Sequence, residues 1–106
     1  MDERISAVCD RQRAVLEGLG MEVVDAEPDL REALEVFKVL RAWRYTLAHG
    51  ERVRDPAKRA VMKPDLVWNT EQGFQLSAED VAVAEGKRTE LFHRMRTFME
   101  IGRAHV

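Results

Sequence analysis

The chain has 106 residues, of which 45% are hydrophobic and 34% are charged, a composition typical of a globular domain rather than of a disordered segment. Its 17 Lys and Arg residues are mixed with 19 Asp and Glu residues, and the formal net charge of -2 argues against binding to nucleic acid or to an anionic membrane. No apolar run approaches the length that crosses a bilayer.

Cysteine usage and the start of the sequence predict the compartment. Cys9 is the only cysteine, so it has no intramolecular disulfide partner. Residues 1–13 lack the charged and then apolar pattern of a secretory leader. We therefore expect a reduced, cytoplasmic setting. The sequence also shows no internal repeat and no linker that would divide it into two domains.

The first predicted elements are a helix and a strand. Apolar residues recur at steps of three and four along the helix, at Ile5, Val8, Cys9, Val15, Leu16 and Leu19, and Gly20 ends it. Cys9 lies on this face, where a buried thiol is expected rather than a nucleophile. The segment from Met21 to Ala26 contains Val23 and Val24 and predicts a short strand. A lone strand needs a partner strand from elsewhere, because its backbone groups are otherwise unpaired.

Four helices are predicted in the rest of the chain, one of them a short helix that follows a turn within the charged stretch from Glu51 to Arg59. Asp29 and Glu32 have the spacing of a capping box, and the long helix that follows has an apolar face wide enough to imply burial on two sides, with Gly50 as its expected stop. A short helix is expected over residues 64–72, between Pro64 and Gly73. Ser77 and Asp80 predict the cap of the final helix, in which Gly86 is an internal glycine.

Few residues are candidates for a site, and each has a structural explanation as well. His49 and His93 are far apart in sequence and have no Cys or paired Asp at ligand spacing, so we predict no metal site and no cofactor. Ser77 is better explained as a helix cap than as a nucleophile. Trp68 and Asn69 are weak candidates for the wall of a substrate pocket, although burial in a core or an interface would also explain the tryptophan.

Short motifs occur in a fixed order along residues 1–99. They are Glu-Val-Val, Pro-Asp-Leu, Phe-Lys-Val-Leu-Arg-Ala, Lys-Pro-Asp-Leu-Val-Trp-Asn, Gly-Phe-Gln-Leu-Ser and Lys-Arg-Thr-Glu-Leu-Phe-His-Arg-Met. In order and spacing they resemble the C-terminal part of amidase signature enzymes. The resemblance implies an α/β parent fold, a mixed sheet covered by helices, to which this mostly helical fragment adds one strand. None of the motifs is catalytic.

The resemblance also implies a reaction and a set of partners. Such enzymes hydrolyse carboxylic amides through a Ser, cis-Ser, Lys triad, with backbone amides of a Gly/Ser-rich signature stabilising the oxyanion. This chain has only Ser6 and Ser77 and no such signature, so we predict that its catalytic residues lie outside it and that it is inactive alone. Its partners would be the remainder of the parent chain and a small-molecule amide, whose identity the sequence leaves open.

The last residues, 100–106, are predicted to be a non-native tail. They translate the DNA string GAGATCGGAAGAGCACACGTC, which from its second letter matches the start of a widely used sequencing adapter. The partial amidase domain would then cover residues 1–99. The competing interpretation is a genuine disordered terminus. A different hypothesis for the whole chain is a small helical interaction module that binds a partner or a second copy of itself.

Overall fold

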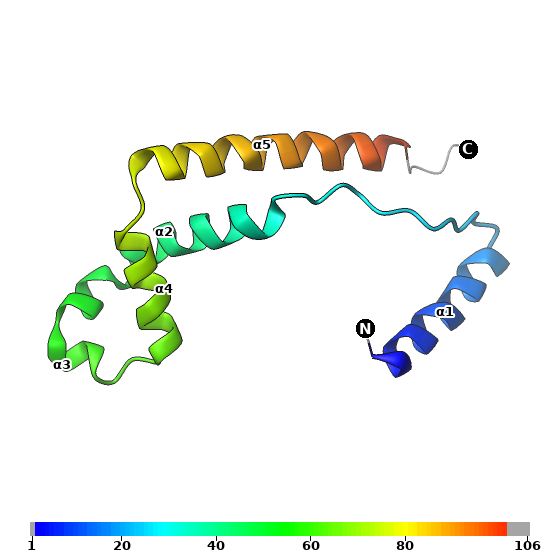
Figure 1. The fold of residues 1–106 in the computed structure, drawn as a ribbon. Coiled ribbons are helices and arrows are strands. Elements are labelled where there is room, and N and C mark those ends of the chain that lie inside the picture. Colours follow the sequence, from blue (N-terminus) through cyan, green and yellow to red (C-terminus); the bar gives the residue numbers. More distant parts are fainter. Residues whose placement is uncertain (1, 102–106) are drawn as a thin grey trace.

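The computed structural model describes residues 2–101 and contains five helices in that range (Figure 1). They are α1 (Glu3–Gly18), α2 (Ala33–Arg54), α3 (Pro56–Arg59), α4 (Pro64–Phe74) and α5 (Ala78–Ile101). The predicted mostly helical character is confirmed. The predicted tail falls partly outside this range: residues 102–106 are not described, whereas Glu100 and Ile101 belong to the last turn of α5.

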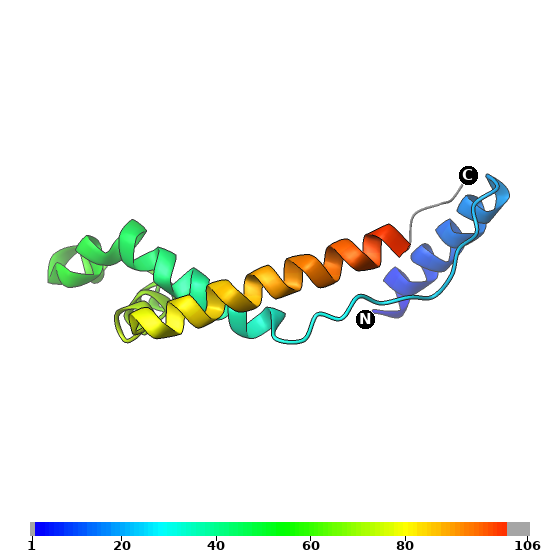
Figure 2. The same ribbon diagram turned by 90° about the horizontal axis from the view of Figure 1, so that it is seen from above.

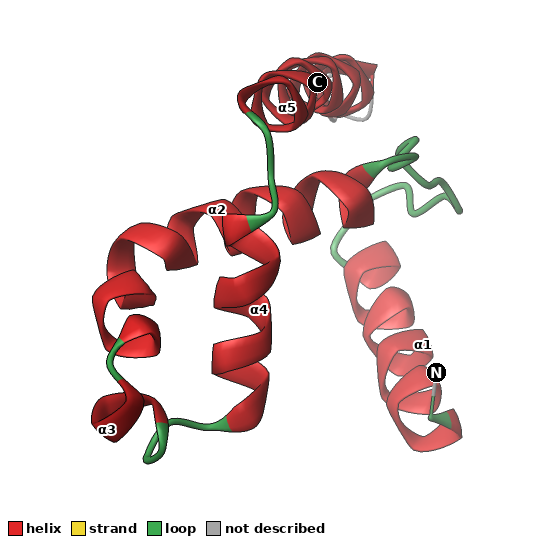
Figure 3. Cartoon of the chain, turned by 60° about the vertical axis from the view of Figure 1, so that its left-hand side comes forward, coloured by secondary structure: helices red, strands yellow, loops and turns green. Residues whose placement is uncertain are grey.

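Helix α2 is the central element, because α3, α4 and α5 all pack against it. The chain reverses through α3, and α4 then returns to pack against the middle of α2, where Gly73 lies against Ala42 and Thr46 (Figure 3). Helix α5 then runs back along the first half of α2 in the opposite direction, and the two helices cross when viewed from above (Figure 2). The core therefore consists of two helix–helix interfaces that share α2.

Small side chains form these interfaces. The buried apolar residues are Val36, Ala42, Val53, Val67 and Ala84, and Thr70 is fully buried at 0% exposure. Gly50 and Gly73 are buried as well. The predictions that these two glycines end helices are wrong: both lie inside helices, where the missing side chain lets another element approach. The Phe74 ring would lie 3.5 Å from a Cβ at Gly50.

The large apolar side chains are mostly exposed. The wide apolar face of α2 predicts burial on two sides, but Leu47 is 86% exposed and Leu34 is 64% exposed. The radius of gyration is 20.3 Å, compared with about 13 Å for a compact chain of this length. The described chain therefore covers only part of its apolar surface.

Helix α1 has no buried residue. The prediction that Cys9 is buried is wrong, because no other element covers this face of α1 and the thiol is exposed. One arginine joins α1 to the segment that follows: Arg13 donates to the Val23 carbonyl at 3.0 Å and pairs with Asp25 at 2.7 Å. Gly20 adopts a positive φ of 92° just after the helix, which agrees with its predicted role as a stop.

The strand predicted from Met21 to Ala26 is not formed within the described residues. The segment is extended, but none of the backbone–backbone hydrogen bonds of the described chain involves residues 22–29. The physical reason is the one that the sequence suggests, since a strand is defined by its ladder and no second strand lies beside it. Extended conformation is thus present without pairing.

The two predicted capping boxes differ in outcome. Asp29 does not cap α2: its carboxylate accepts from the Arg31 backbone at 3.1 Å, and Glu32 enters the left-handed region at φ 69° before the helix begins at Ala33. The cap of α5 is confirmed. The Asp80 amide donates to Ser77 Oγ at 3.0 Å, and the Ser77 amide donates to Asp80 Oδ2 at 2.9 Å.

This reciprocal cap predicts a pH dependence of the start of α5. Hydrogen bonds from the Ser77 backbone and then its side chain lower the pKa of Asp80 below the usual value for an aspartate. The stabilisation is therefore fully present above the ordinary aspartate pKa and is lost as the pH falls through the lowered pKa. Circular dichroism should show a loss of helicity as the pH falls into the acid range. This loss should be smaller in Asp80→Asn, which lacks the titrating carboxyl, and unchanged in the control variant Glu79→Gln. Ser77→Ala should cost about 1 kcal/mol at neutral pH.

Candidate functional site

The sequence candidates Trp68 and Asn69 line one hollow, between α2 and α4. Its volume is about 240 Å³, below the roughly 300–1,000 Å³ of pockets for drug-sized ligands. The residues that line it are Lys38, Val39, Arg41, Ala42, Trp68, Asn69, Gln72 and Leu76. We call this hollow the α2–α4 groove. It has room for a single ring or a short chain with one polar group.

Arg41 is the central polar residue of the groove. Its Nη2 donates to Asn69 Oδ1 at 3.2 Å, which is a long bond to a neutral acceptor. Its Nε is buried and has no hydrogen-bond partner. The guanidinium carbon lies 4.7 Å from the centroid of the Phe37 ring, and this cation–π contact attracts the guanidinium to the face of the ring. The charge is thus held in place with its donors only partly used.

Asn69 is oriented by its own helix. Its Nδ2 donates to the Asp65 carbonyl, one turn earlier in α4, at 2.8 Å. This bond fixes which end of the amide is the acceptor, so that Oδ1 faces Arg41. Asn69 therefore positions the guanidinium without neutralising it, because an amide carries no charge.

The groove has a positive rim and an apolar wall. Lys38 and Arg41 come from successive turns of α2, and no carboxylate lines the hollow. Neither cation forms an ion pair with another described residue. Trp68 is 58% exposed, so a large part of its indole is available for contact. Such a site favours a small anion with an apolar body.

No family model, curated protein or solved structure matches the chain.

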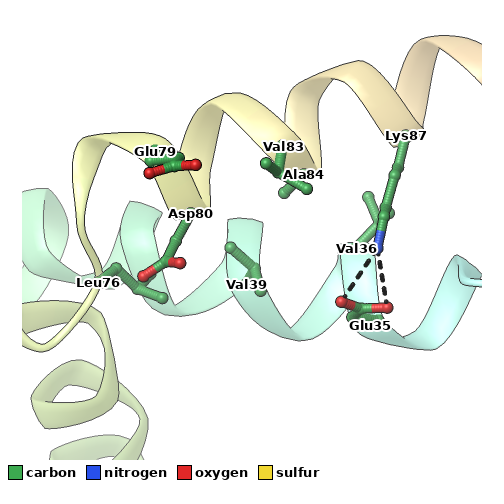
Figure 4. Close-up of a pocket in the computed structure, with 9 residues that line it drawn as sticks. All are labelled: Glu35, Val36, Val39, Leu76, Glu79, Asp80, Val83, Ala84 and Lys87. Atoms are coloured by element: carbon green, nitrogen blue, oxygen red, sulfur yellow. Dashed lines mark hydrogen bonds and ion pairs between the residues drawn. The ribbon is translucent and has the colours of Figure 1, made fainter.

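A second hollow lies between α2 and α5 and has a volume of about 380 Å³ (Figure 4). Lys87 donates to both carboxylate oxygens of Glu35 at 3.2 Å at one end. Asp80 and Leu76 lie at the other end, and Val36 and Val39 of α2 face α5 between them. Three of the four charged side chains of this hollow are already in use, because Glu35 pairs with Lys87 and Asp80 caps α5, and the fourth, Glu79, is an acid in the first turn of α5. This hollow is the weaker candidate for a ligand.

Trp68 and Asn69, the sequence candidates, both lie on the α4 side of the α2–α4 groove, and sequence reasoning singled out no residue on the α2 side. Arg41 and Asn69 are separated by 28 positions, and only the packing of α4 on α2 brings them together. The signal that could have indicated Arg41 is a cation beside an apolar stripe with no acid within four positions.

The remaining sequence candidates lie away from the groove or have structural roles. Ser77 accepts a hydrogen bond from the Asp80 amide and caps α5. His49 Nδ1 lies 2.8 Å from Arg52 Nη2, and its ring is edge-on to Tyr45 at 5.2 Å. His93 contacts the Phe92 ring on α5. Among the described residues, no helix is both long and apolar enough to cross a membrane.

Proposed function

We propose that this chain is a part of an amidase signature hydrolase, an enzyme that cleaves carboxylic amide C–N bonds. The catalytic Ser, cis-Ser, Lys triad belongs to a part of the enzyme outside this chain. The chain contributes outer helices, one strand and a wall of the substrate pocket, and it is inactive alone. The enzyme acts in the cytoplasm, and its substrate is a small-molecule amide.

One structural observation supports this proposal. Large apolar side chains on three helices have no covering element within the described residues, among them Ile5, Val8 and Val15 of α1, Phe37 and Leu47 of α2, and Phe92 and Met99 of α5. Surfaces of this kind mark sites of contact with other protein surfaces. The rest of the parent enzyme is the partner that covers them.

The extended segment before α2 has the same explanation. Residues 22–29 carry backbone donors and acceptors that make no backbone–backbone hydrogen bond within the described chain. In the parent, Met21 to Ala26 joins the mixed sheet as a strand, and pairing with its neighbours satisfies these groups. In the same parent enzyme, the short helix α4 lies beside the substrate pocket, and Trp68 and Asn69 form part of the pocket wall.

Extension of the genomic DNA on both sides tests the proposal most directly. The expected result is an in-frame Gly/Ser-rich signature upstream of Met1, with the serine and lysine residues of the triad, and a different continuation after Met99. A ribosome-binding sequence and start site before Met1, together with a native stop after Val106, would contradict the proposal.

Amide hydrolysis gives the biochemical test. The intact enzyme should release ammonia from simple carboxylic amides such as benzamide, and replacing its nucleophilic serine with alanine should abolish the release. The chain of 106 residues should release no ammonia above background, because it contains neither the triad nor the oxyanion donors. Hydrolysis by this chain alone would show that the assignment of the triad is wrong.

The exposed apolar faces also favour a second candidate, a helical interaction module that associates with itself. A module should sediment as one defined oligomer. A part of a larger enzyme should instead bind the dye ANS at its uncovered apolar faces and associate without a defined stoichiometry, even where its packed helices unfold cooperatively. Replacing Phe37 with glutamine should weaken a specific dimer but leave heterogeneous association through the other faces largely unchanged.

A further inference from the structure

The α2–α4 groove contains a charge that the described chain leaves uncompensated. Arg41 has one hydrogen-bond acceptor, Asn69 Oδ1, and that acceptor is neutral. Its Nε is buried without any partner. A buried donor that lacks an acceptor costs free energy, and in native proteins almost every such group has one. Nε itself is closed off from the groove, so a ligand would reach the guanidinium through the Arg41 atoms that line the groove, and the positive charge of the group selects an anion.

The geometry of the groove specifies the kind of anion. A guanidinium presents donors in a planar fork that matches the two oxygens of a carboxylate. Lys38 adds a second positive charge on the rim, and no acid of the groove competes. Val39, Ala42, Trp68 and Leu76 make the rest of the lining mainly apolar. A strongly hydrated anion such as phosphate would lose its water against this wall without enough donors to replace it.

We propose that the α2–α4 groove binds a small carboxylate that carries a flat apolar group, with Arg41 and Lys38 holding the carboxylate and Trp68 contacting the ring. The volume of about 240 Å³ limits the apolar group to one ring or a short chain. One part of the inference rests on the proposed function: in an amidase, this ligand would be a substrate that carries a carboxylate as well as the amide that is cleaved. Binding itself is a property of the described residues.

Titration of the ¹⁵N-labelled full chain with benzoate tests the proposal. The reporter is the indole N–H signal of Trp68, assigned by its persistence in the Trp43→Phe variant. Benzoate should shift this signal in a saturable way. Benzamide, which has the same ring without the charge, should bind at least tenfold more weakly, and inorganic phosphate should also bind more weakly than benzoate.

Four variants show which residues carry the binding. Arg41→Gln should weaken benzoate binding at least tenfold, and Arg41→Lys should have an intermediate effect because it keeps the charge but not the fork. Lys38→Gln, on the exposed rim, should weaken binding a few-fold. Arg11→Gln removes one charge from the exposed surface of α1 and should leave binding unchanged. A dispersed spectrum of each variant shows that its fold is retained.

Several outcomes would overturn the proposal. They are equal affinity for benzoate and benzamide, tighter binding of phosphate than of benzoate, and unchanged binding in a folded Arg41→Gln variant. A wild-type chain without a dispersed spectrum would overturn it too, since the groove requires α4 to be packed on α2. None of these results bears on the genomic test, so failure of the ligand inference and failure of the amidase proposal can be told apart.

Discussion

Replacement of Gly73 by alanine is expected to lower the free energy of unfolding by about 3 kcal/mol, the upper part of the range for overpacked interfaces. A Cβ at this position would overlap the carbonyl oxygen of Ala42 and would lie 2.5 Å from Thr46 Cγ2. The obstacle at Ala42 is backbone, which cannot rotate away as a flexible side chain can. Helix α4 would have to move away from α2 along the interface that also forms the groove.

Chemical denaturation monitored by circular dichroism measures this effect, and the chain supplies a matched control. Gly86 lies inside α5, and nothing is within 4 Å of a Cβ built there. Gly86→Ala should therefore stabilise the chain by about 0.5–1 kcal/mol, because alanine is the better helix former. If Gly73→Ala were as stable as the wild type, α4 would not approach α2 as described. Benzoate binding should be lost together with the stability of this interface.

Replacement of Thr70 by alanine should produce the second largest loss, about 2 kcal/mol. Thr70 has 0% exposure and is the largest fully buried side chain among the described residues. Alanine removes its methyl and hydroxyl groups and leaves a void, because the helix backbones on either side prevent the gap from closing. The midpoint of urea denaturation should fall while the m-value stays unchanged.

Thr70→Val separates packing from hydrogen bonding at the same position. The threonine Oγ1 donates to the Leu66 carbonyl at 2.8 Å, a bond within its own helix. Valine keeps the shape and removes the hydroxyl, and replacing a buried hydroxyl with an apolar group costs little when no donor is stranded. We expect a change of less than about 1 kcal/mol. A loss as large as that of the alanine variant would show that the hydrogen bond, rather than the filled volume, stabilises this position.

The helices could be predicted from sequence because their signals are local. Pro64 at the start of α4 and the Ser77–Asp80 cap of α5 each act within one turn, and both occur as predicted. Gly50 and Gly73 have the composition of helix stops but act in tertiary packing. Whether a glycine ends a helix or admits a neighbouring backbone depends on which residues face it, and that information lies 24 to 31 positions away in Phe74 and Ala42.

The groove could be predicted only in part for the same reason. Trp68 and Asn69 stand together in the sequence, whereas their partner Arg41 belongs to another helix. Cys9 shows a second limit of prediction from sequence, because its burial depends on an element that the pattern of its own helix does not reveal. The amphipathic pattern of α1 predicts a buried face correctly only if something covers that face, and the identity of the covering element is not encoded in the pattern.

The central position of α2 has a consequence for the order of folding. The contacts between α2 and α4 close a short loop through α3, so their loss of chain entropy is small and they can form early. Helix α5 can dock only after α2 has formed, and α1 adds no buried residue to either step. Amide hydrogen exchange should therefore be slowest in the middle of α2 and in α4, intermediate in α5 and fastest in α1.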